Sequence, residues 1–399
     1  SYAIYLWHWP LVILAEARWG DLPVWTLAAL GAGSVLLAWL TKHLVEDPIR
    51  FQKSLAAAPW RSLLAGGTTM AVLSTLALTG WVTRPTLVDE PPESADPGLV
   101  GAAALVSDRD ASDWEVRGDP ETVYTPSGPL VPDPTLATDD VPAYYADDCQ
   151  IGVGDAEPDD RCVYGQIDAD AELVLWGDSK LGQYFTPFDA IAEREGWRLT
   201  TYLKSACPPT VAGALEDECS EFGTNVVERI LGQQTPPVAV IISTFTPSTE
   251  PLKEGSREAI GALTSAGIPV IVLADNPGPI IPDDAPYKTI YDCAAERPDD
   301  LASCSFDHRE ANGTELLQGL AEAYDLPVVD LNPWVCPPSG QACPVAIGGE
   351  LVYRQGSHLT DTYARSLSPV LHRELLAVGV GETDPRSISL TDVPPRSSE

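Results

Sequence analysis

The sequence Leu173-Val-Leu-Trp-Gly-Asp-Ser179 joins an apolar run to a turn that ends in a serine. Leu173 to Trp176 predict a buried strand, and Gly177 permits the sharp turn that follows it. A parallel strand of this kind delivers the hydroxyl of Ser179 to the carboxyl edge of an α/β sheet, where active sites form. The segment therefore predicts an α/β fold with a serine nucleophile.

Strand-like apolar runs alternate with helical patterns from Cys149 onward. This alternation predicts a doubly wound parallel sheet with helices on both faces. The last helix is predicted from Asp361 to Ala377. The predicted strands are Leu173 to Trp176, Trp197 to Leu203, Val238 to Ser243, Pro269 to Ala274 and Leu326 to Leu331.

A serine hydroxyl becomes a nucleophile only when a base accepts its proton. The chain has five histidines, and His358 is the best placed of them, because it lies just before the last predicted helix. A reference pKa near 6.5 suits this side chain to the transfer of a proton. The alternative interpretation is that Ser179 caps a helix and that His358 is a polar residue at a helix N-terminus.

Four segments carry a resemblance to known families. Gly177-Asp178-Ser179 resembles the first block of the SGNH (GDSL-like) hydrolase superfamily, and Gln355-Gly-Ser-His358 resembles its last block, Asp-x-x-His. Ser1-Tyr-Ala-Ile-Tyr-Leu-Trp-His-Trp-Pro10 and Val45-Glu-Asp-Pro-Ile-Arg50 resemble the closing segments of the membrane acyltransferase-3 family. Together they resemble the fused acyltransferase-3/SGNH architecture of bacterial cell-surface O-acyltransferases, of which the chain would be the C-terminal part. The resemblance implies a flavodoxin-like parallel sheet of about five strands, preceded by transmembrane helices.

Gln355 stands where the family pattern has the aspartate that orients the histidine. A glutamine accepts a hydrogen bond but supplies no negative charge to an imidazolium. The sequence therefore predicts a Ser179-His358 dyad, oriented by Gln355 or by a backbone carbonyl, or else an inactive domain.

The oxyanion hole would use the backbone amide of Ser179 and donors from the loops after the second and third strands. Lys204-Ser-Ala-Cys-Pro-Pro209 resembles the second block of the family, which makes Ser205 a candidate. Thr244 is a candidate because it stands where many members have Gly-x-Asn, but it is equally a strand-end residue. Lys180, in place of a histidine common in this subtype, is expected to be exposed, and Asn276 is expected in a turn.

The chain of 399 residues has a formal net charge of -34 and a pI near 4.2. Such acidity argues against nucleic acid as a partner. Residues 1 to 84 contain few carboxylates, whereas the rest is rich in them. This asymmetry predicts a membrane part and a solvated part.

All eight cysteines lie between residues 149 and 343. Eight cysteines allow about 105 connectivities, and short loops favour pairing between neighbours. The chain lacks the closely spaced Cys pairs of a zinc site, so no metal is predicted and disulfides in an extracytoplasmic compartment are favoured. The predicted pairs are Cys149 with Cys162, Cys207 with Cys219, Cys293 with Cys304, and Cys336 with Cys343.

Three apolar stretches precede residue 84, namely Tyr2 to Ala17, Val24 to Leu44 and Leu63 to Val82. The last two have about the length that crosses a bilayer core of roughly 30 Å. Basic residues between them place the 42 to 61 loop in the cytoplasm by the positive-inside rule. The predicted organisation is a transmembrane part at 1–84, a Pro/Asp-rich linker or irregular cover at 85–146, an SGNH-like domain at 147–380 and a polar tail at 381–399.

The combined expectation is a membrane-bound O-acyltransferase that transfers acetyl groups to a cell-surface glycan or glycolipid. It would be a multi-pass protein of the bacterial cell membrane whose SGNH-like domain lies outside. No bound cofactor is expected, and an acyl donor such as acetyl-CoA is implied for the membrane part that precedes this chain. The alternatives are a glycan O-acyl esterase and a catalytically silent glycan-binding domain.

Overall fold

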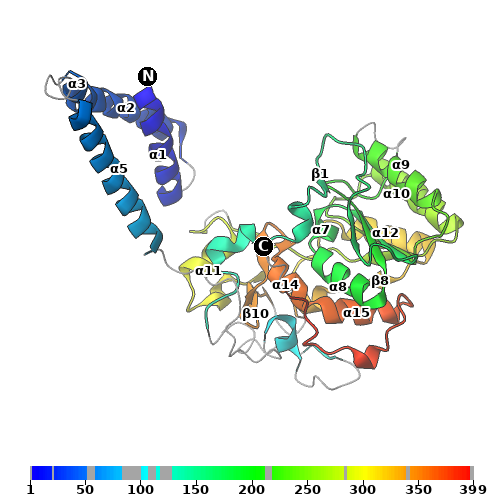
Figure 1. Cartoon of the computed structure of the whole chain (residues 1–399). Helices are drawn as coiled ribbons and strands as arrows, with labels where there is room; N and C mark the ends of the chain where they lie inside the picture. Colours follow the sequence, from blue (N-terminus) through cyan, green and yellow to red (C-terminus); the bar gives the residue numbers. More distant parts are fainter. Residues whose placement is uncertain are drawn as a thin grey trace. The chain divides into compact units, whose positions relative to one another are not determined.

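The computed structural model describes residues 2–19, 22–51, 59–82, 100–106, 114–116, 128–211, 218–282, 285–337 and 342–395. The chain divides into two compact units, Ser1–Thr86 and Leu87–Glu399 (Figure 1). Almost the whole segment 85–146 therefore falls within the second unit. Each unit is described by itself below.

The N-terminal unit is helical. The indole Nε1 of Trp7 donates a hydrogen bond to Thr41 Oγ1 at 2.9 Å and so ties the first helix to the second. Its helices are α1 (Tyr2–Trp19), α2 (Val24–Thr41), the π-helical turn η1 (Lys42–Glu46), α3 (Asp47–Arg50) and α5 (Pro59–Val82).

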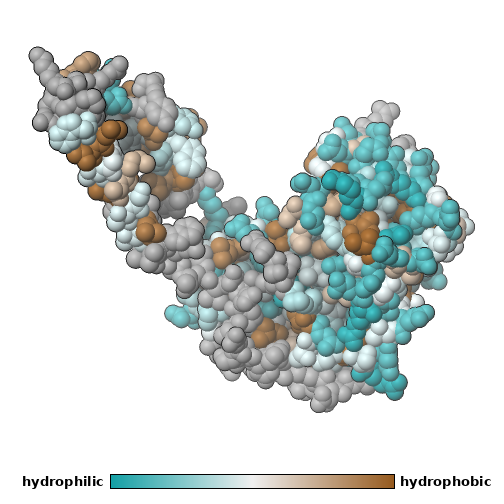
Figure 2. Space-filling view, viewed as in Figure 1, coloured by the Kyte–Doolittle hydropathy of each residue, from teal (hydrophilic) through white to brown (hydrophobic). Residues whose placement is uncertain are grey.

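Large apolar side chains of this unit are exposed, for example Trp25 at 75%. Figure 2 shows hydrophobic residues in brown along these helices, whereas the visible face of the C-terminal unit is largely hydrophilic. Among the residues that the structure describes, one helix, Val24–Glu46, is long and apolar enough to cross a membrane, with a mean hydropathy of 1.7. Membrane insertion of α1 and α5 stays a prediction.

The C-terminal unit is built on a seven-stranded sheet with the order β1-β4-β3-β5-β6-β8, in which β2 pairs with β4. All pairs are parallel except β2 with β4. The predicted α/β class is thereby confirmed, and the five predicted strands are β3, β4, β5, β6 and β8. The strands are β1 (Gln150–Ile151), β2 (Val163–Gly165), β3 (Glu172–Gly177), β4 (Arg198–Lys204), β5 (Ala239–Ser243), β6 (Val270–Leu273) and β8 (Val328–Val329).

Helices cover both faces of the sheet (Figure 1). Leu173 and Leu175 of β3 join an apolar cluster with α8 (Phe185–Glu195) and α15 (Ser368–Ala377). Successive strand residues point to opposite faces, so Val174 and Trp176 join a second cluster. That cluster packs under α9 (Glu218–Leu231), α10 (Glu250–Ser265) and α12 (Thr314–Tyr324).

The single helix predicted from Asp361 to Ala377 is wrong, because two helices occupy this segment. They are α14 (Asp361–Ser366) and α15, separated at Leu367. Pro369 lies in the first turn of α15, where its missing N–H costs nothing, whereas inside one continuous helix it would remove a hydrogen bond.

The remaining elements of the C-terminal unit are short. Strands β7 and β9, β10 and β11, and β12 and β13 form three antiparallel pairs. Their bounds are α7 (Ser179–Gly182), α11 (Ile290–Glu296), α13 (Asn332–Val335), β7 (Phe306–Asp307), β9 (Ala342–Cys343), β10 (Ala346–Ile347), β11 (Glu350–Leu351), β12 (Tyr353–Gln355), β13 (His358–Leu359), η6 (Leu301–Cys304) and η7 (Pro385–Ser387).

The described parts of the segment predicted as a linker pack onto the domain. Turns η3 (Gly101–Leu105), η4 (Pro134–Asp139) and η5 (Ala143–Tyr145) contribute buried residues to the first apolar cluster. The amide of Ala102 also donates a hydrogen bond to Ser366 Oγ at 3.0 Å. These parts form an irregular cover, which was the second of the two forms expected for 85–146, and the rest lies outside the described residues.

The segment predicted as a polar tail is also attached to the domain. The carboxylate of Glu195 in α8 accepts a hydrogen bond from the amide of Glu382 at 2.8 Å. Arg194 forms an ion pair with Asp392 at 2.8 Å. Apolar side chains such as Leu390 are buried in the first cluster, so hydrophobic burial extends the domain beyond residue 380.

Four disulfides join cysteines that are consecutive along the chain, as the short-loop argument favours. No cysteine is left free. They are Cys149–Cys162, Cys207–Cys219, Cys293–Cys304 and Cys336–Cys343, with sequence separations of 13, 12, 11 and 7 residues. Stable disulfides are typical of oxidising compartments.

Candidate active site

Strand β3 lies at the point where the strand order reverses, because the chain continues to β4 on one side and later to β5 on the other. In open α/β sheets, ligands bind in the crevice at the carboxyl end of such a strand. Ser179, which is half-buried, follows β3 and begins α7, so the fold places it at this carboxyl edge of the sheet.

Gly177 has a different role from the one expected. Among the described residues, it does not belong to the glycines with a positive φ. A Cβ at this position would overlap the carbonyl oxygen of Ser243 on the neighbouring strand β5. The glycine therefore allows close approach of two strands, directly beside the serine.

The two predicted catalytic side chains meet. His358 Nε2 lies 2.8 Å from Ser179 Oγ, although 179 residues separate them in the sequence. Both residues are half-buried, so each keeps part of its surface exposed to solvent. This distance allows the imidazole to accept the hydroxyl proton.

The group that orients His358 is a backbone carbonyl. Its Nδ1 lies 3.1 Å from the main-chain oxygen of Gln355, so Nδ1 carries the hydrogen and Nε2 is the proton acceptor. The side chain of Gln355 is exposed. In the described part of the chain, the ring of His358 has these two hydrogen-bond partners and no carboxylate.

The surroundings of His358 disfavour its charged form. Burial lowers the pKa of the imidazole to about 4, and the positive charges of Lys180 and Arg354 act in the same direction. His358 is therefore neutral, and able to accept a proton, throughout the ordinary pH range. An imidazolium formed during catalysis would gain little stabilisation here.

Asp178 braces the turn that carries the serine. Its Oδ1 accepts the amide of Lys180 at 2.8 Å, and its Oδ2 accepts the amide of Phe245 at 2.9 Å. The hydroxyl of Thr244, predicted as an oxyanion donor, is committed to the same carboxylate, because it donates to Asp178 Oδ2 at 2.7 Å. Burial raises the pKa of Asp178, and these hydrogen bonds oppose that effect.

Ser205, the other predicted oxyanion residue, follows β4 at the same edge of the sheet. Within the described residues its hydroxyl has one partner, Gln150, whose Nε2 donates to it at 3.1 Å. The amide of Ser205 is occupied by the carbonyl of Ile151 at 2.9 Å. The amide of Ser179, in the first turn of α7, remains the donor best placed for an oxyanion.

The expectation that Lys180 is exposed is wrong, because its side chain is 0% exposed. Its ammonium donates to Asn276 Oδ1 at 2.6 Å and to the carbonyl of Ser357 at 2.7 Å. Asn276 follows β6, and its amide also reaches this carbonyl, at 3.0 Å. Asn276 was expected in a turn, but it lies in an irregular segment after β6 and organises the site through these hydrogen bonds.

Sequence reasoning missed this buried cluster, which Asp275 and Gln183 complete. Asp275 Oδ1 lies 3.2 Å from the ammonium of Lys180. Gln183 donates to Asn276 Oδ1 at 2.7 Å and accepts the amide of Leu359 at 2.8 Å. One signal was present: Asp275-Asn276 directly follows an apolar strand, whose end must reach the same sheet edge as Ser179.

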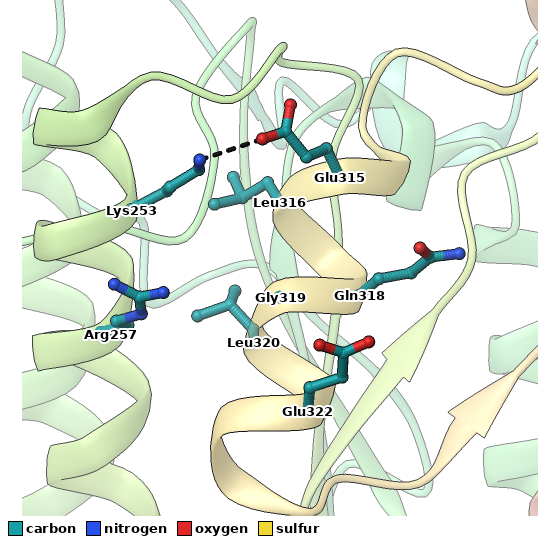
Figure 3. A pocket seen from close by; sticks show the side chains of 8 residues that line it. All are labelled: Lys253, Arg257, Glu315, Leu316, Gln318, Gly319, Leu320 and Glu322. Carbon is teal, nitrogen blue, oxygen red and sulfur yellow. Dashed lines mark ion pairs between the residues drawn. The ribbon is translucent and has the colours of Figure 1, made fainter.

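A surface pocket of about 290 Å³ lies between α10 and α12 (Figure 3). Lys253 and Glu315 form an ion pair of 2.9 Å across it. The pocket contains neither Ser179 nor His358, so it is not part of the candidate active site. In the part of the chain that the structure describes, no group of three His, Cys, Asp or Glu residues is arranged to hold a metal ion.

The backbone geometry predicts that Gln355→Ala leaves the reactivity of Ser179 nearly unchanged. The substitution removes an exposed side chain and keeps the carbonyl that accepts from His358. We expect the rate of p-nitrophenol release from p-nitrophenyl acetate to stay within about twofold of wild type. A loss of more than about tenfold would show that the side chain orients the histidine.

Three comparisons relate the chain to known proteins. Residues 144–373 match the model of a family described as SGNH domain (fused to AT3 domains). One solved structure that the chain resembles is the periplasmic domain of a lipopolysaccharide acetyltransferase from Salmonella ser. Paratyphi A. The two share 13% sequence identity with a TM-score of 0.38, over 53% of this chain and 84% of the other. The search of curated proteins finds no match.

Proposed function

Because the chain belongs to the family of SGNH domains that are fused to AT3 domains, we propose that it is part of a membrane-bound O-acyltransferase of the bacterial cell envelope. Its substrate is a cell-surface glycan or glycolipid, and the transferred group is acetyl. The observation that carries this proposal is the 2.8 Å contact between Ser179 Oγ and His358 Nε2 at the switch point of the sheet.

The dyad acts in two steps. His358 Nε2 takes the proton of Ser179 Oγ, which attacks the carbonyl carbon of the acyl donor and forms a bond to it, and the imidazolium then protonates the leaving group. This leaves an acyl ester on Ser179. A sugar hydroxyl next gives its proton to Nε2 and attacks the ester, and the returned proton regenerates Ser179. The Ser179 amide stabilises the negative oxygen in both steps.

The N-terminal helices anchor this domain. Helices α1, α2 and α5 are the last transmembrane helices of an acyltransferase-3 unit, whose preceding part uses an acyl donor such as acetyl-CoA. The apolar surface of the Val24–Glu46 helix supports this arrangement. The four disulfides support an extracytoplasmic position of the second unit.

A cell-envelope analysis tests the proposed transfer. Deletion of the gene is expected to remove O-acetyl groups from one envelope glycan, detected by mass spectrometry of released oligosaccharides, and wild-type gene but not the Ser179→Ala variant is expected to restore them. A gain of acetylation on deletion would instead identify a glycan O-acyl esterase. An unchanged glycan would contradict both activities.

One observation favours a second candidate, a catalytically silent glycan-binding domain. Within the described chain, His358 has no carboxylate partner, and the hydroxyl of Thr244 is committed to Asp178. This candidate predicts that the Ser179→Ala variant restores acetylation as well as wild type does. The complementation experiment therefore separates the two.

A further inference from the structure

The buried ammonium of Lys180 lies under the turn that carries His358. Strands β12 and β13 form a hairpin whose turn is Gly356-Ser357. Lys180 Nζ donates to the Ser357 carbonyl at 2.7 Å and lies 3.2 Å from its hydroxyl. The residue that directly follows the nucleophile thus holds the residue that directly precedes the histidine.

Leu359, on the other side of His358, is held by Gln183 at the C-terminal end of α7. The amide of Leu359 donates to Gln183 Oε1 at 2.8 Å. Asn276 links the two attachments, because it accepts from both Lys180 and Gln183. The backbone on both sides of the histidine is therefore fixed to the turn that presents Ser179.

Stability alone does not explain a lysine at this position. Lys180 and its ion-pair partner Asp275 are both 0% exposed, and burial lowers the pKa of Lys180 while Asp275 opposes that effect. Buried ion pairs of this kind often stabilise a fold no more than apolar residues of the same volume. The directed hydrogen bonds of the ammonium are what an apolar side chain could not supply.

We propose that Lys180 is a positioning residue of the acyl-transfer dyad, which fixes the imidazole of His358 against the hydroxyl of Ser179 through the Ser357 carbonyl. This inference rests on the proposed function. In a full triad a carboxylate helps to orient the histidine. Here the buried side chain of Lys180 would help to orient His358, by holding the backbone next to it. A displacement of about 1 Å between reacting groups can cost about 100-fold in rate.

Lys180 has an electrostatic effect as well. In the described chain, the charged groups that act on His358 are Lys180 from α7 and Arg354 from β12. Asp275, at the end of β6, is the ion-pair partner of Lys180, and the carboxylate of Asp178, at the end of β3, accepts the amide of Lys180. Removal of the ammonium leaves Asp275 without its counter-ion. The loss of the Lys180 charge and the unpaired carboxylate of Asp275 both favour the imidazolium, so we expect the pKa of His358 to rise.

The test uses the full chain in detergent and follows acetylation of Ser179 by p-nitrophenyl acetate from pH 3.5 to 8. Lys180→Met is expected to slow acetylation about 100-fold and to move its acid limb from about pH 4 towards about 6.5. Lys180→Gln keeps a hydrogen-bond donor but has no charge. We expect it to acetylate faster than Lys180→Met and to keep the same shifted acid limb.

Lys204→Met is the matched control. Lys204 is 1% exposed and its ammonium donates to the carbonyls of Gly152, Val153 and Asp155, so its loss removes a buried ammonium of the same kind. We expect a lower melting temperature and an acid limb at the wild-type pH. A merely structural Lys180 would behave like this control.

An unchanged rate and acid limb in folded Lys180→Met would overturn the proposal. If neither Lys180 variant folds, the NMR coupling across the hydrogen bond between the Lys180 ammonium ¹⁵N and the Ser357 carbonyl ¹³C in wild type decides, and its absence would overturn the proposal. A wild-type chain that is folded but never acetylated would contradict the proposed function instead, and this coupling would still test the contact.

Discussion

Ser179→Ala is expected to eliminate the acetyl adduct that p-nitrophenyl acetate forms on the chain, detected as a mass increase of one acetyl group in the intact protein. Among the described residues, Ser179 Oγ is the hydroxyl that lies within hydrogen-bond distance of His358 Nε2, at 2.8 Å, and it is therefore the one that the imidazole can activate. Ester turnover is expected to fall by about 100-fold. The turnover rate of a dyad without a carboxylate is roughly 10⁴-fold below that of a full triad, so removal of the serine lowers the rate by a smaller factor.

His358→Ala is expected to cost as much as Ser179→Ala, and the double variant no more than either, because the two groups act as one unit. Ser303→Ala, which changes an exposed serine of η6, is the matched control and should retain full turnover. An adduct that persists in Ser179→Ala would place the nucleophile elsewhere.

Gly223→Ala is expected to lower the free energy of unfolding of the C-terminal unit by about 3 kcal/mol. Gly223 lies in α9, and a Cβ there would overlap the carbonyl oxygen of Thr210. Backbone cannot move aside as a flexible side chain can, so α9 must shift from the loop that begins at Ser205. Chemical denaturation followed by tryptophan fluorescence measures this loss.

Gly319→Ala provides the matched control for this substitution. Gly319 also lies inside a helix, α12, but no atom lies within 4 Å of its added Cβ, because it faces the open pocket of Figure 3. Alanine is expected to stabilise this helix by about 0.5 to 1 kcal/mol. Equal effects of the two substitutions would contradict the contact between α9 and Thr210.

Much of the fold follows from local patterns. The buried strands β3, β5 and β6 contain continuous apolar runs bounded by turn residues, whereas β4 mixes leucine and tyrosine with two threonines. Strands β1 and β2 were missed because they contain two and three half-buried residues, too few to carry a pattern. The cover formed by 100–106 and 128–146 was ambiguous, since its buried residues are small or isolated among proline and aspartate.

The dyad was predictable for a different reason, because Ser179 and His358 each lie in a segment that resembles a family motif. Lys180 has no such local signal. Its partners Asn276 and Ser357 are 96 and 177 residues away, and exposure is the ordinary state of a lysine. Only the three-dimensional structure shows that the end of β6 and the turn between β12 and β13 meet at its ammonium.

The disulfide arrangement bears on how the chain matures. Each bond joins a cysteine to the next one along the chain, and the separations are 13, 12, 11 and 7 residues. In the extracytoplasmic location proposed above, the second cysteine of each pair can bond to the first as the polypeptide emerges from a translocation channel. Wrong pairings must be undone by slow thiol exchange. The order in which the cysteines emerge disfavours such pairings, so we expect the four disulfides to form without a requirement for a disulfide isomerase.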